Sequence, residues 1–305
     1  MAQRLSGIMP AVASPCSEDD TFLEEEFAAL VTCLYGHGIH GLYVGGGTGD
    51  GYNQRPDERK RGAEIACELG RQHQRKTIVH VGALNSREAM ALAEHAAECG
   101  ADALASMPPP TRGQAELVLY YRDICRAGQL PVIIYHIPAL TGYTPNLENM
   151  LELLDIEGIV GLKATDWNLF FIRRLLLERP DICVFNGYDE YLALSLFYGA
   201  TGGIGTFYNL FPELFLGIYR AVQAGDFDRA LRLQMPFVEL AHLFHRYGVR
   251  PVFELLMRQR GLAPFCFRRP RLELSSASLR SLQPLLVERL NALEKTIADE
   301  TQPRP

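Results

Sequence analysis

One lysine in this sequence lies where an amine needs a chemical reason. Lys163 is near the end of "GIVGLKAT", an apolar run typical of a buried strand. Burying an amine costs several kcal/mol unless it is paired, so pairing with a carboxylate or reaching the solvent is one explanation. The other is catalytic: desolvation favours the neutral amine, which can attack a ketone.

Tyr135 lies one apolar run earlier, in "VIIYHIP". Strand alternation places it on the same side as Ile133 and Ile137, and it places His136 on the opposite side. If the two runs are adjacent strands, the phenol lies beside the amine and could relay a proton. Packing alone also explains a tyrosine in a strand, because aromatic residues favour strands. We expect His136 to be a hydrogen-bonded packing residue.

A glycine-rich stretch, "YVGGGTGDGY" at 43–52, follows another apolar run. It has neither the lysine of a Walker loop nor a G-x-G-x-x-G register, which makes a nucleotide site a poor interpretation. Successive glycine N–H groups can surround an anion, and Thr48 adds a hydroxyl, so the stretch is consistent with a site for a small carboxylate. A tight turn that needs positive φ angles explains it equally well.

Eight short apolar runs would position these residues. They alternate with helical stretches and are predicted to be parallel strands at 7–13, 41–46, 77–83, 102–108, 131–138, 158–164, 182–187 and 202–207. Eight strands in about 200 residues predict the α/β class and a (β/α)8 TIM barrel rather than a doubly wound nucleotide-binding fold. In such a barrel the active site lies at the C-terminal ends of the strands, where the three features above meet.

The alternation of predicted strands and helices ends after the eighth run. The segments from Asn209 onward have helical periodicity with no strand between them. We therefore expect a barrel over residues 1–224, a helical C-terminal extension over 225–300 and a frayed tail over 301–305.

Composition narrows the function classes. A net charge of -6 offers no basic surface for nucleic acid or acidic lipid, and no apolar run approaches membrane-spanning length. The seven cysteines are widely spaced without a C-x-x-C pair, so we expect reduced thiols, no disulfide framework and no zinc site. The N-terminal apolar stretch is short and broken by Pro10, which makes it a poor signal sequence. The expected location is cytoplasmic.

Taken together, these motifs resemble the N-acetylneuraminate lyase and dihydrodipicolinate synthase superfamily of class I, pyruvate-dependent aldolases. The segments that carry the resemblance are "GLYVGGGTGDGYNQRPDERK", "VIIYHIPALTGY", "GIVGLKATDWNLF" and "VFNGYDEYLALSLFYGATGGIGTFYN". The last is similar to the pattern of the lyase branch. The resemblance covers nearly the whole chain.

The resemblance implies a role for each matching residue. Lys163 would form the imine, Tyr135 would relay protons, and Thr48 with the backbone of Gly47 would hold the carboxylate of a 2-keto acid. The polyol part of a sugar acid would contact Gly187, Asp189, Glu190 and Thr206. An acidic start to the following helix is the alternative explanation of "YDEY". The resemblance also implies a homotetramer that needs no metal and no organic cofactor.

Three departures from the family pattern affect the expected substrate or the expected subunit contacts. Gly47 stands where relatives usually have a Ser or Thr hydroxyl. The segment "SMPPPTRG" at 106–113 lacks the aromatic pair that reaches a neighbouring subunit. Leu140 replaces the arginine with which synthases bind a second carboxylate, and an isobutyl group cannot do the work of a guanidinium there.

We therefore expect a Schiff-base lyase, or aldolase, that interconverts a 2-keto acid with pyruvate and an aldehyde, similar to N-acetylneuraminate lyase. The alternatives are a 2-keto-3-deoxy sugar acid aldolase or dehydratase and, against the evidence of Leu140, a dihydrodipicolinate synthase. A barrel that binds 2-keto acids without turnover is the alternative outside enzymology.

Overall fold

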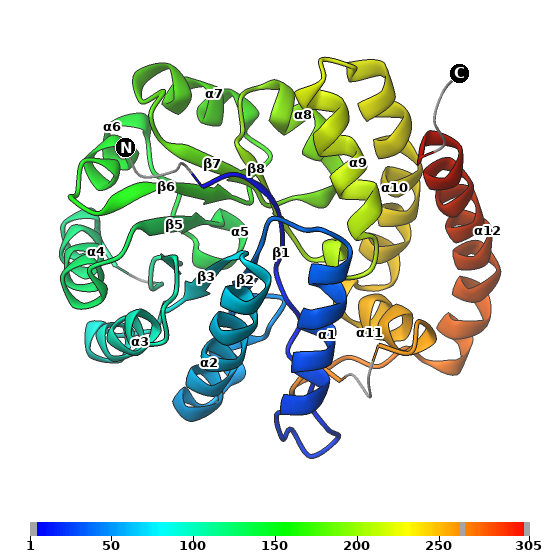
Figure 1. Cartoon of the computed structure of the whole chain (residues 1–305), viewed down its shortest axis with the longest axis horizontal. Coiled ribbons are helices and arrows are strands. Elements are labelled where there is room, and N and C mark those ends of the chain that lie inside the picture. The colour runs from blue at the N-terminus through cyan, green and yellow to red at the C-terminus, as the bar shows by residue number, and fades with distance from the viewer. Residues whose placement is uncertain (1–4, 111, 263–265, 302–305) are drawn as a thin grey trace.

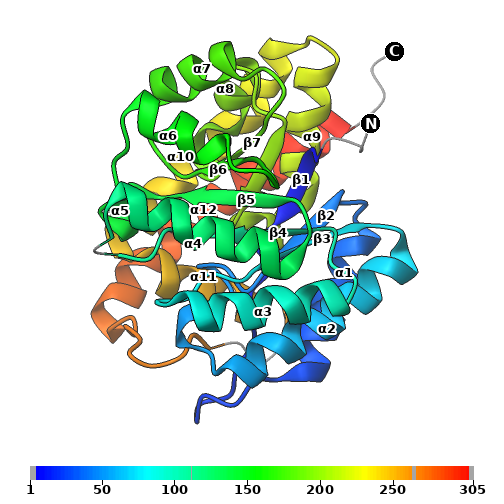
Figure 2. The same cartoon turned by 90° about the vertical axis from the view of Figure 1, so that its left-hand side faces the viewer.

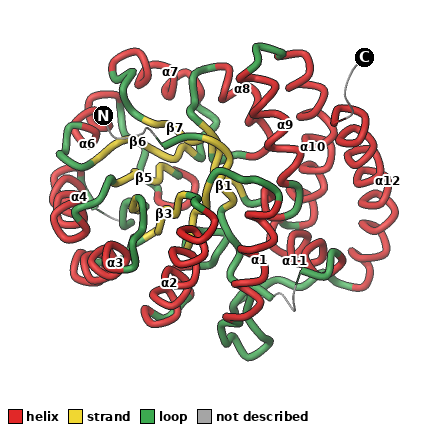
Figure 3. Tube along the Cα trace, in the orientation of Figure 1, coloured by secondary structure: helices red, strands yellow, loops and turns green. Residues whose placement is uncertain are grey.

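Eight parallel strands form a barrel at the centre of the computed structural model, which describes residues 5–110, 112–262 and 266–301 (Figures 1 and 3). The strands are β1 Gly7–Pro10, β2 Gly41–Val44, β3 Lys76–His80, β4 Ala103–Ser106, β5 Val132–His136, β6 Ile159–Ala164, β7 Cys183–Asn186 and β8 Gly202–Gly205. Their order around the sheet is β1-β8-β7-β6-β5-β4-β3-β2. An isolated parallel bridge between Ala11 and Tyr43 joins the two ends of the sheet, and the (β/α)8 prediction is confirmed.

Helices surround the barrel and connect successive strands. They are α1 Glu24–Gly36, α2 Pro56–His73, α3 Ser86–Glu98, α4 Gln114–Gly128, α5 Pro138–Thr141, α6 Leu147–Leu154, α7 Leu169–Glu178, α8 Leu192–Phe197 and α9 Pro212–Gln223. Local chemistry fixes where they begin. The Asn85 side chain accepts the Glu88 N–H at 3.0 Å and caps α3. Pro56 begins α2, where its missing N–H costs nothing.

Side-chain alternation along the strands creates two apolar cores. Residues that point outward, such as Leu42 and Val44, pack under the helices. Residues that point inward fill the barrel, among them Tyr43, Ile133 and Tyr135. The expected runs extend past the strand ends because the residues that follow, such as Val12 and Ala13, stay buried after the chain has left the sheet. Burial and strand pairing therefore have different boundaries.

The C-terminal extension consists of α10 Phe227–Tyr247, α11 Val249–Gln259 and α12 Ser276–Thr301. Helix α10 packs against α8 and α9, and α12 forms the outer edge next to α10 (Figures 1 and 2). The described residues also include short 3-10 turns at Gly51–Asn53, Asp189–Tyr191 and Phe207–Asn209. None of the helices in the described ranges is long and apolar enough to cross a membrane. The predicted tail lies outside the described residues apart from Thr301.

Candidate active site

Lys163 and Tyr135 meet inside the barrel near its C-terminal end. They are direct partners in the register of the neighbouring parallel strands β5 and β6. The Lys163 Nζ lies 4.1 Å from the centre of the Tyr135 ring, and both side chains are buried. As strand alternation predicts, Ile133 and Ile137 lie in the same interior cluster as Tyr135. The arrangement gives the amine a phenol as its immediate neighbour.

Tyr43 completes an aromatic box that the sequence reasoning did not include. Its ring centre is 4.5 Å from the Lys163 Nζ, and its ring meets that of Tyr135 edge-on at 6.0 Å. Among the described residues its buried hydroxyl has no hydrogen-bond partner. Its position between the outward-facing Leu42 and Val44 is the alternation signal that could have identified it. Two ring faces stabilise the ammonium or an iminium at this point.

Burial controls the protonation of the amine. Desolvation lowers the pKa of Lys163 from 10.5 to about 7, and the charge of Asp189 opposes this shift. Desolvation also raises the pKa of Tyr135 to about 12, against the effect of the Thr165 hydroxyl. Near neutral pH the site therefore offers a neutral amine as a nucleophile and a protonated phenol as a proton donor.

The rate of imine formation with pyruvate is expected to rise with pH and to reach half its maximum near pH 7, because only the neutral Lys163 amine attacks. For an ordinary lysine the rise would lie about three pH units higher. Cyanoborohydride trapping followed from pH 5.5 to 9.5, with free N-acetyl-lysine as the reference, measures the midpoint. A rate that still climbs steeply above pH 9 would contradict the lowered pKa.

The glycine-rich stretch folds as a tight turn at the same end of the barrel. Gly45 has a φ of +73°, and a Cβ at Gly51 would lie 1.9 Å from the Gly45 carbonyl oxygen, so both positions require glycine. The turn is closed by bonds from the Asp50 and Gly51 N–H groups to the carbonyls of Gly47 and Gly46. The geometry thus accounts for part of the glycine content through the turn itself.

The turn also presents polar groups toward the site. A Cβ placed on Gly47 would have the Tyr135 hydroxyl, 3.9 Å away, as its only near neighbour, so the space of the missing hydroxyl is open. The Thr48 and Thr206 hydroxyls are 2.7 Å apart, which joins the β2 turn to the end of β8. Within the described chain the Gly47 and Thr48 N–H groups donate none of the identified hydrogen bonds. Backbone N–H groups of this kind are able to donate hydrogen bonds to a bound carboxylate.

Asp189 is a buried carboxyl with one free oxygen. Its Oδ2 accepts the Phe207 N–H at 2.7 Å, whereas its Oδ1 has no partner among the described residues. Desolvation raises its pKa to about 8, and nearby Glu190 adds to the shift. A buried oxygen without a partner is costly unless a ligand or water satisfies it. Asp189 is therefore well placed to bind a hydroxyl.

The remaining predicted contacts differ in quality. Glu190 is already engaged, because its Oε1 lies 2.8 Å from Nε2 of His245 on α10. Gly187 is needed for the close approach of two chain segments, since a Cβ there would lie 1.9 Å from the Thr165 hydroxyl.

His136 faces the helices instead of the barrel interior, and its Nε2 lies 3.0 Å from Asp166 Oδ2. It is the hydrogen-bonded packing residue that the sequence predicts.

One group outside the barrel combines side chains that can bind metal. Glu64 on α2 and His95 and Cys99 on α3 bring three potential ligand atoms within 4.8 Å of one another. His95 Nε2 and Glu64 Oε1 are already 3.0 Å apart as an ion pair, and Arg61 binds the second oxygen of Glu64 at 2.9 Å. Within the described ranges, no such group includes residues of the candidate active site.

Comparison with known proteins points to one family. Residues 4–289 match the model of the dihydrodipicolinate synthetase family. The N-acetylneuraminate lyase of Rhizobium meliloti is 33% identical over 298 residues, which cover 96% of this chain and 98% of the relative. A pyruvate complex of N-acetylneuraminate lyase from Fusobacterium nucleatum superposes with a TM-score of 0.86 at 28% identity, covering 93% and 97% of the chains. A Clostridium difficile protein in complex with mannosamine has a TM-score of 0.87 at 26% identity, covering 96% and 100%.

Proposed function

The chain belongs to the dihydrodipicolinate synthetase family, and we propose that it cleaves or forms an N-acetylneuraminate-like 2-keto acid through an imine on Lys163. The enzyme is a lyase of the class I aldolase type, and its curated relatives are N-acetylneuraminate lyases. The observation that carries the residue assignment is the buried Lys163 amine, which lies 4.1 Å from the Tyr135 ring with a pKa of about 7.

The proposed reaction begins when the neutral Lys163 amine adds to the ketone carbon, while the Gly47 and Thr48 N–H groups and the Thr48 hydroxyl hold the neighbouring carboxylate. Tyr135 then donates its proton to the departing hydroxyl of the carbinolamine, which leaves as water and gives a protonated imine. The resulting phenolate takes the proton of the C4 hydroxyl. The C3–C4 bond breaks, its electrons neutralise the iminium as an enamine, and an aldehyde leaves. Protonation at C3 and hydrolysis release pyruvate.

Borohydride reduction in the presence of pyruvate tests this assignment. We expect a pyruvyl adduct that peptide mass spectrometry locates at Lys163. An adduct at another lysine would contradict the residue assignment, and no adduct at all would favour the alternative of a barrel that binds 2-keto acids without turnover.

Asp189 is proposed to bind a hydroxyl of the polyol chain through its free Oδ1. The Asp189→Asn variant is expected to raise the KM for polyhydroxylated aldehydes about ten- to a hundredfold while pyruvate trapping persists, because an amide N–H can then stand where the free Oδ1 accepts a hydrogen bond. Glu190→Gln is the matched control, and its effect should be smaller because its carboxylate already binds His245. Equal increases in KM in Asp189→Asn and Glu190→Gln would contradict the proposal that Asp189 contributes more to substrate binding than Glu190.

The second substrate is proposed to be a sugar aldehyde rather than aspartate semialdehyde. Leu140 on α5 is 67% exposed and lines a cavity of about 450 Å³ together with Tyr52 and Met107, where an isobutyl group offers no charge to a second carboxylate. A screen of aldehydes for pyruvate addition ranks the candidates, including those of 2-keto-3-deoxy sugar acids. Faster turnover of aspartate semialdehyde would favour the dihydrodipicolinate synthase alternative.

We propose that the enzyme is a cytoplasmic homotetramer. Support for assembly comes from large exposed side chains on α7, α8 and α10, such as Phe170, Phe197 and Leu231. The segment at 106–113, whose residue 111 lies outside the described part of the chain, carries no tyrosine for a neighbouring subunit. Light scattering measures the molar mass of the assembly in solution. A mass below that of a tetramer is the expected result if the segment at 106–113 weakens a contact between subunits.

A further inference from the structure

Two buried cysteines face each other away from the barrel interior. Cys16 lies in the loop between β1 and α1, and Cys266 lies between α11 and α12. They pair as an isolated antiparallel bridge, and the Cys16 thiol donates to the Cys266 carbonyl oxygen at 2.9 Å. Directly opposite residues in such a pair have Cα atoms about 4.5 to 5.5 Å apart, which lies within the range that disulfides span. The backbone is therefore already placed for a bond between the two sulfurs.

The surroundings of the two sulfurs differ. The guanidinium of Arg258 donates to the Cys266 Sγ at 2.9 Å and also pairs with Glu254 at 2.7 Å. Burial raises the pKa of the Cys16 thiol to about 11. Cys16 is held in place by its own small hairpin, since it also pairs with Phe22. One sulfur is thus in contact with a guanidinium, and the other is held in place by the hairpin.

We propose that Cys16 and Cys266 form a reversible thiol-oxidation site that links the loop after β1 to the C-terminal extension. Hydrogen peroxide transfers one oxygen to the Cys266 thiol, which becomes a sulfenic acid, and the other oxygen leaves as water. The Cys16 sulfur then attacks the sulfenic sulfur, the S–S bond forms, and a second molecule of water departs. A dithiol reverses the reaction by exchange, which restores both thiols and oxidises the dithiol.

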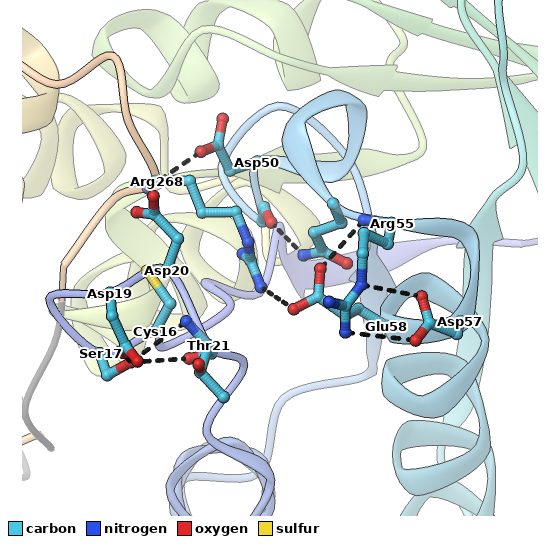
Figure 4. A network of polar contacts seen from close by, with 12 residues as sticks. Cys16, Ser17, Asp19, Asp20, Thr21, Asp50, Arg55, Asp57, Glu58 and Arg268 are labelled. Carbon is cyan, nitrogen blue, oxygen red and sulfur yellow. Dashed lines mark hydrogen bonds and ion pairs between the residues drawn. The ribbon is translucent and has the colours of Figure 1, made fainter.

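The position of the pair connects it to the glycine-rich turn. Two residues after Cys266, the Arg268 N–H donates to Asp50 Oδ2 at 3.3 Å, and its guanidinium donates to Glu58 at 3.2 Å. Arg250 on α11 donates to the other oxygen of Asp50 at 2.9 Å. Figure 4 shows Arg268 between the loop that contains Cys16 and the carboxylates of Asp50 and Glu58. The disulfide therefore fixes the segment whose contacts hold the end of the glycine-rich turn.

The bond would join positions 250 residues apart, so it restricts the unfolded chain strongly. Oxidation of the full-length protein by hydrogen peroxide is expected to raise the midpoint of thermal unfolding by about 5 °C or more, and dithiothreitol should reverse the shift. Peptide mapping without reduction should recover one peptide that contains both Cys16 and Cys266.

Three variants and one internal standard make the test decisive. Cys266→Ser should lose both the cross-linked peptide and the thermal shift, and Cys16→Ala should do the same. Cys67→Ala removes another buried cysteine, on α2, and should retain both. The exposed Cys33 reports by its own oxidation that peroxide has reacted. If Cys33 is oxidised while no Cys16–Cys266 peptide appears, the proposal is wrong, whatever the outcome of the Lys163 experiments.

Discussion

Replacement of Lys163 by Met is expected to abolish pyruvate trapping and to lower kcat on the order of 10⁴-fold or more, because no other group in the aromatic box can form the imine. Met fills similar space without a buried amine. Borohydride trapping and the rate of pyruvate release measure the loss. Lys76→Met is the matched control, since Lys76 begins β3 and forms an exposed ion pair with Asp102. Its activity should change by less than about twofold.

The same variant separates loss of chemistry from loss of folding. Lys163 binds a proton up to about pH 10.5 when unfolded but only up to about pH 7 when folded, so unfolding takes up a proton between these values. The contribution of Lys163 to the free energy of unfolding therefore increases as the pH rises from about 7 to about 10.5. Lys163→Met should lack this rise and should be more stable than the native enzyme at pH 7, as denaturant titrations at several pH values would measure. A Lys163→Met variant that is less stable than the native enzyme at pH 7 would contradict the lowered pKa of Lys163.

The barrel and the adjacency of Lys163 and Tyr135 could be predicted because they depend on patterns that are local in sequence. Short apolar runs specify buried strands, and alternation specifies which side chains enter the barrel. Consecutive parallel strands then bring equivalent ends together, as the Tyr135–Lys163 register shows. Alternation along the second apolar run likewise places Tyr43 in the barrel interior.

Other features depend on contacts that no local pattern specifies. The contact between Glu190 and His245 joins the 3-10 turn after β7 to α10, 55 positions apart in the sequence. The bonds that Asp50 accepts come from Arg250 and Arg268 in the extension. Both depend on how the extension packs against the barrel, and helical periodicity gives no information about that packing. The adjacency of Lys163 and Tyr135 could therefore be predicted, whereas the contacts that support the candidate site could not.

The proposed proton relay by Tyr135 rests on its ring, which lies 4.1 Å from the Lys163 amine. Tyr135→Phe is expected to lower kcat about 10²- to 10⁴-fold, because proton transfer to the carbinolamine and from the C4 hydroxyl both lose their relay. Since burial raises the pKa of Tyr135 to about 12, the native phenol stays protonated across the neutral range, and the deficit should be similar from pH 6 to 9. Steady-state pyruvate release at these pH values measures it.

Tyr43→Phe is the comparison that isolates the hydroxyl from the ring. The ring centre of Tyr135 lies 4.1 Å from the Lys163 Nζ, and that of Tyr43 lies 4.5 Å from it. The Tyr43 hydroxyl has no hydrogen-bond partner among the described residues. Its removal keeps the ring face and breaks no hydrogen bond, so the expected loss is less than about tenfold. If Tyr135→Phe and Tyr43→Phe lower kcat by similar factors, the two tyrosines act through their rings. The proton relay would then have to be another group.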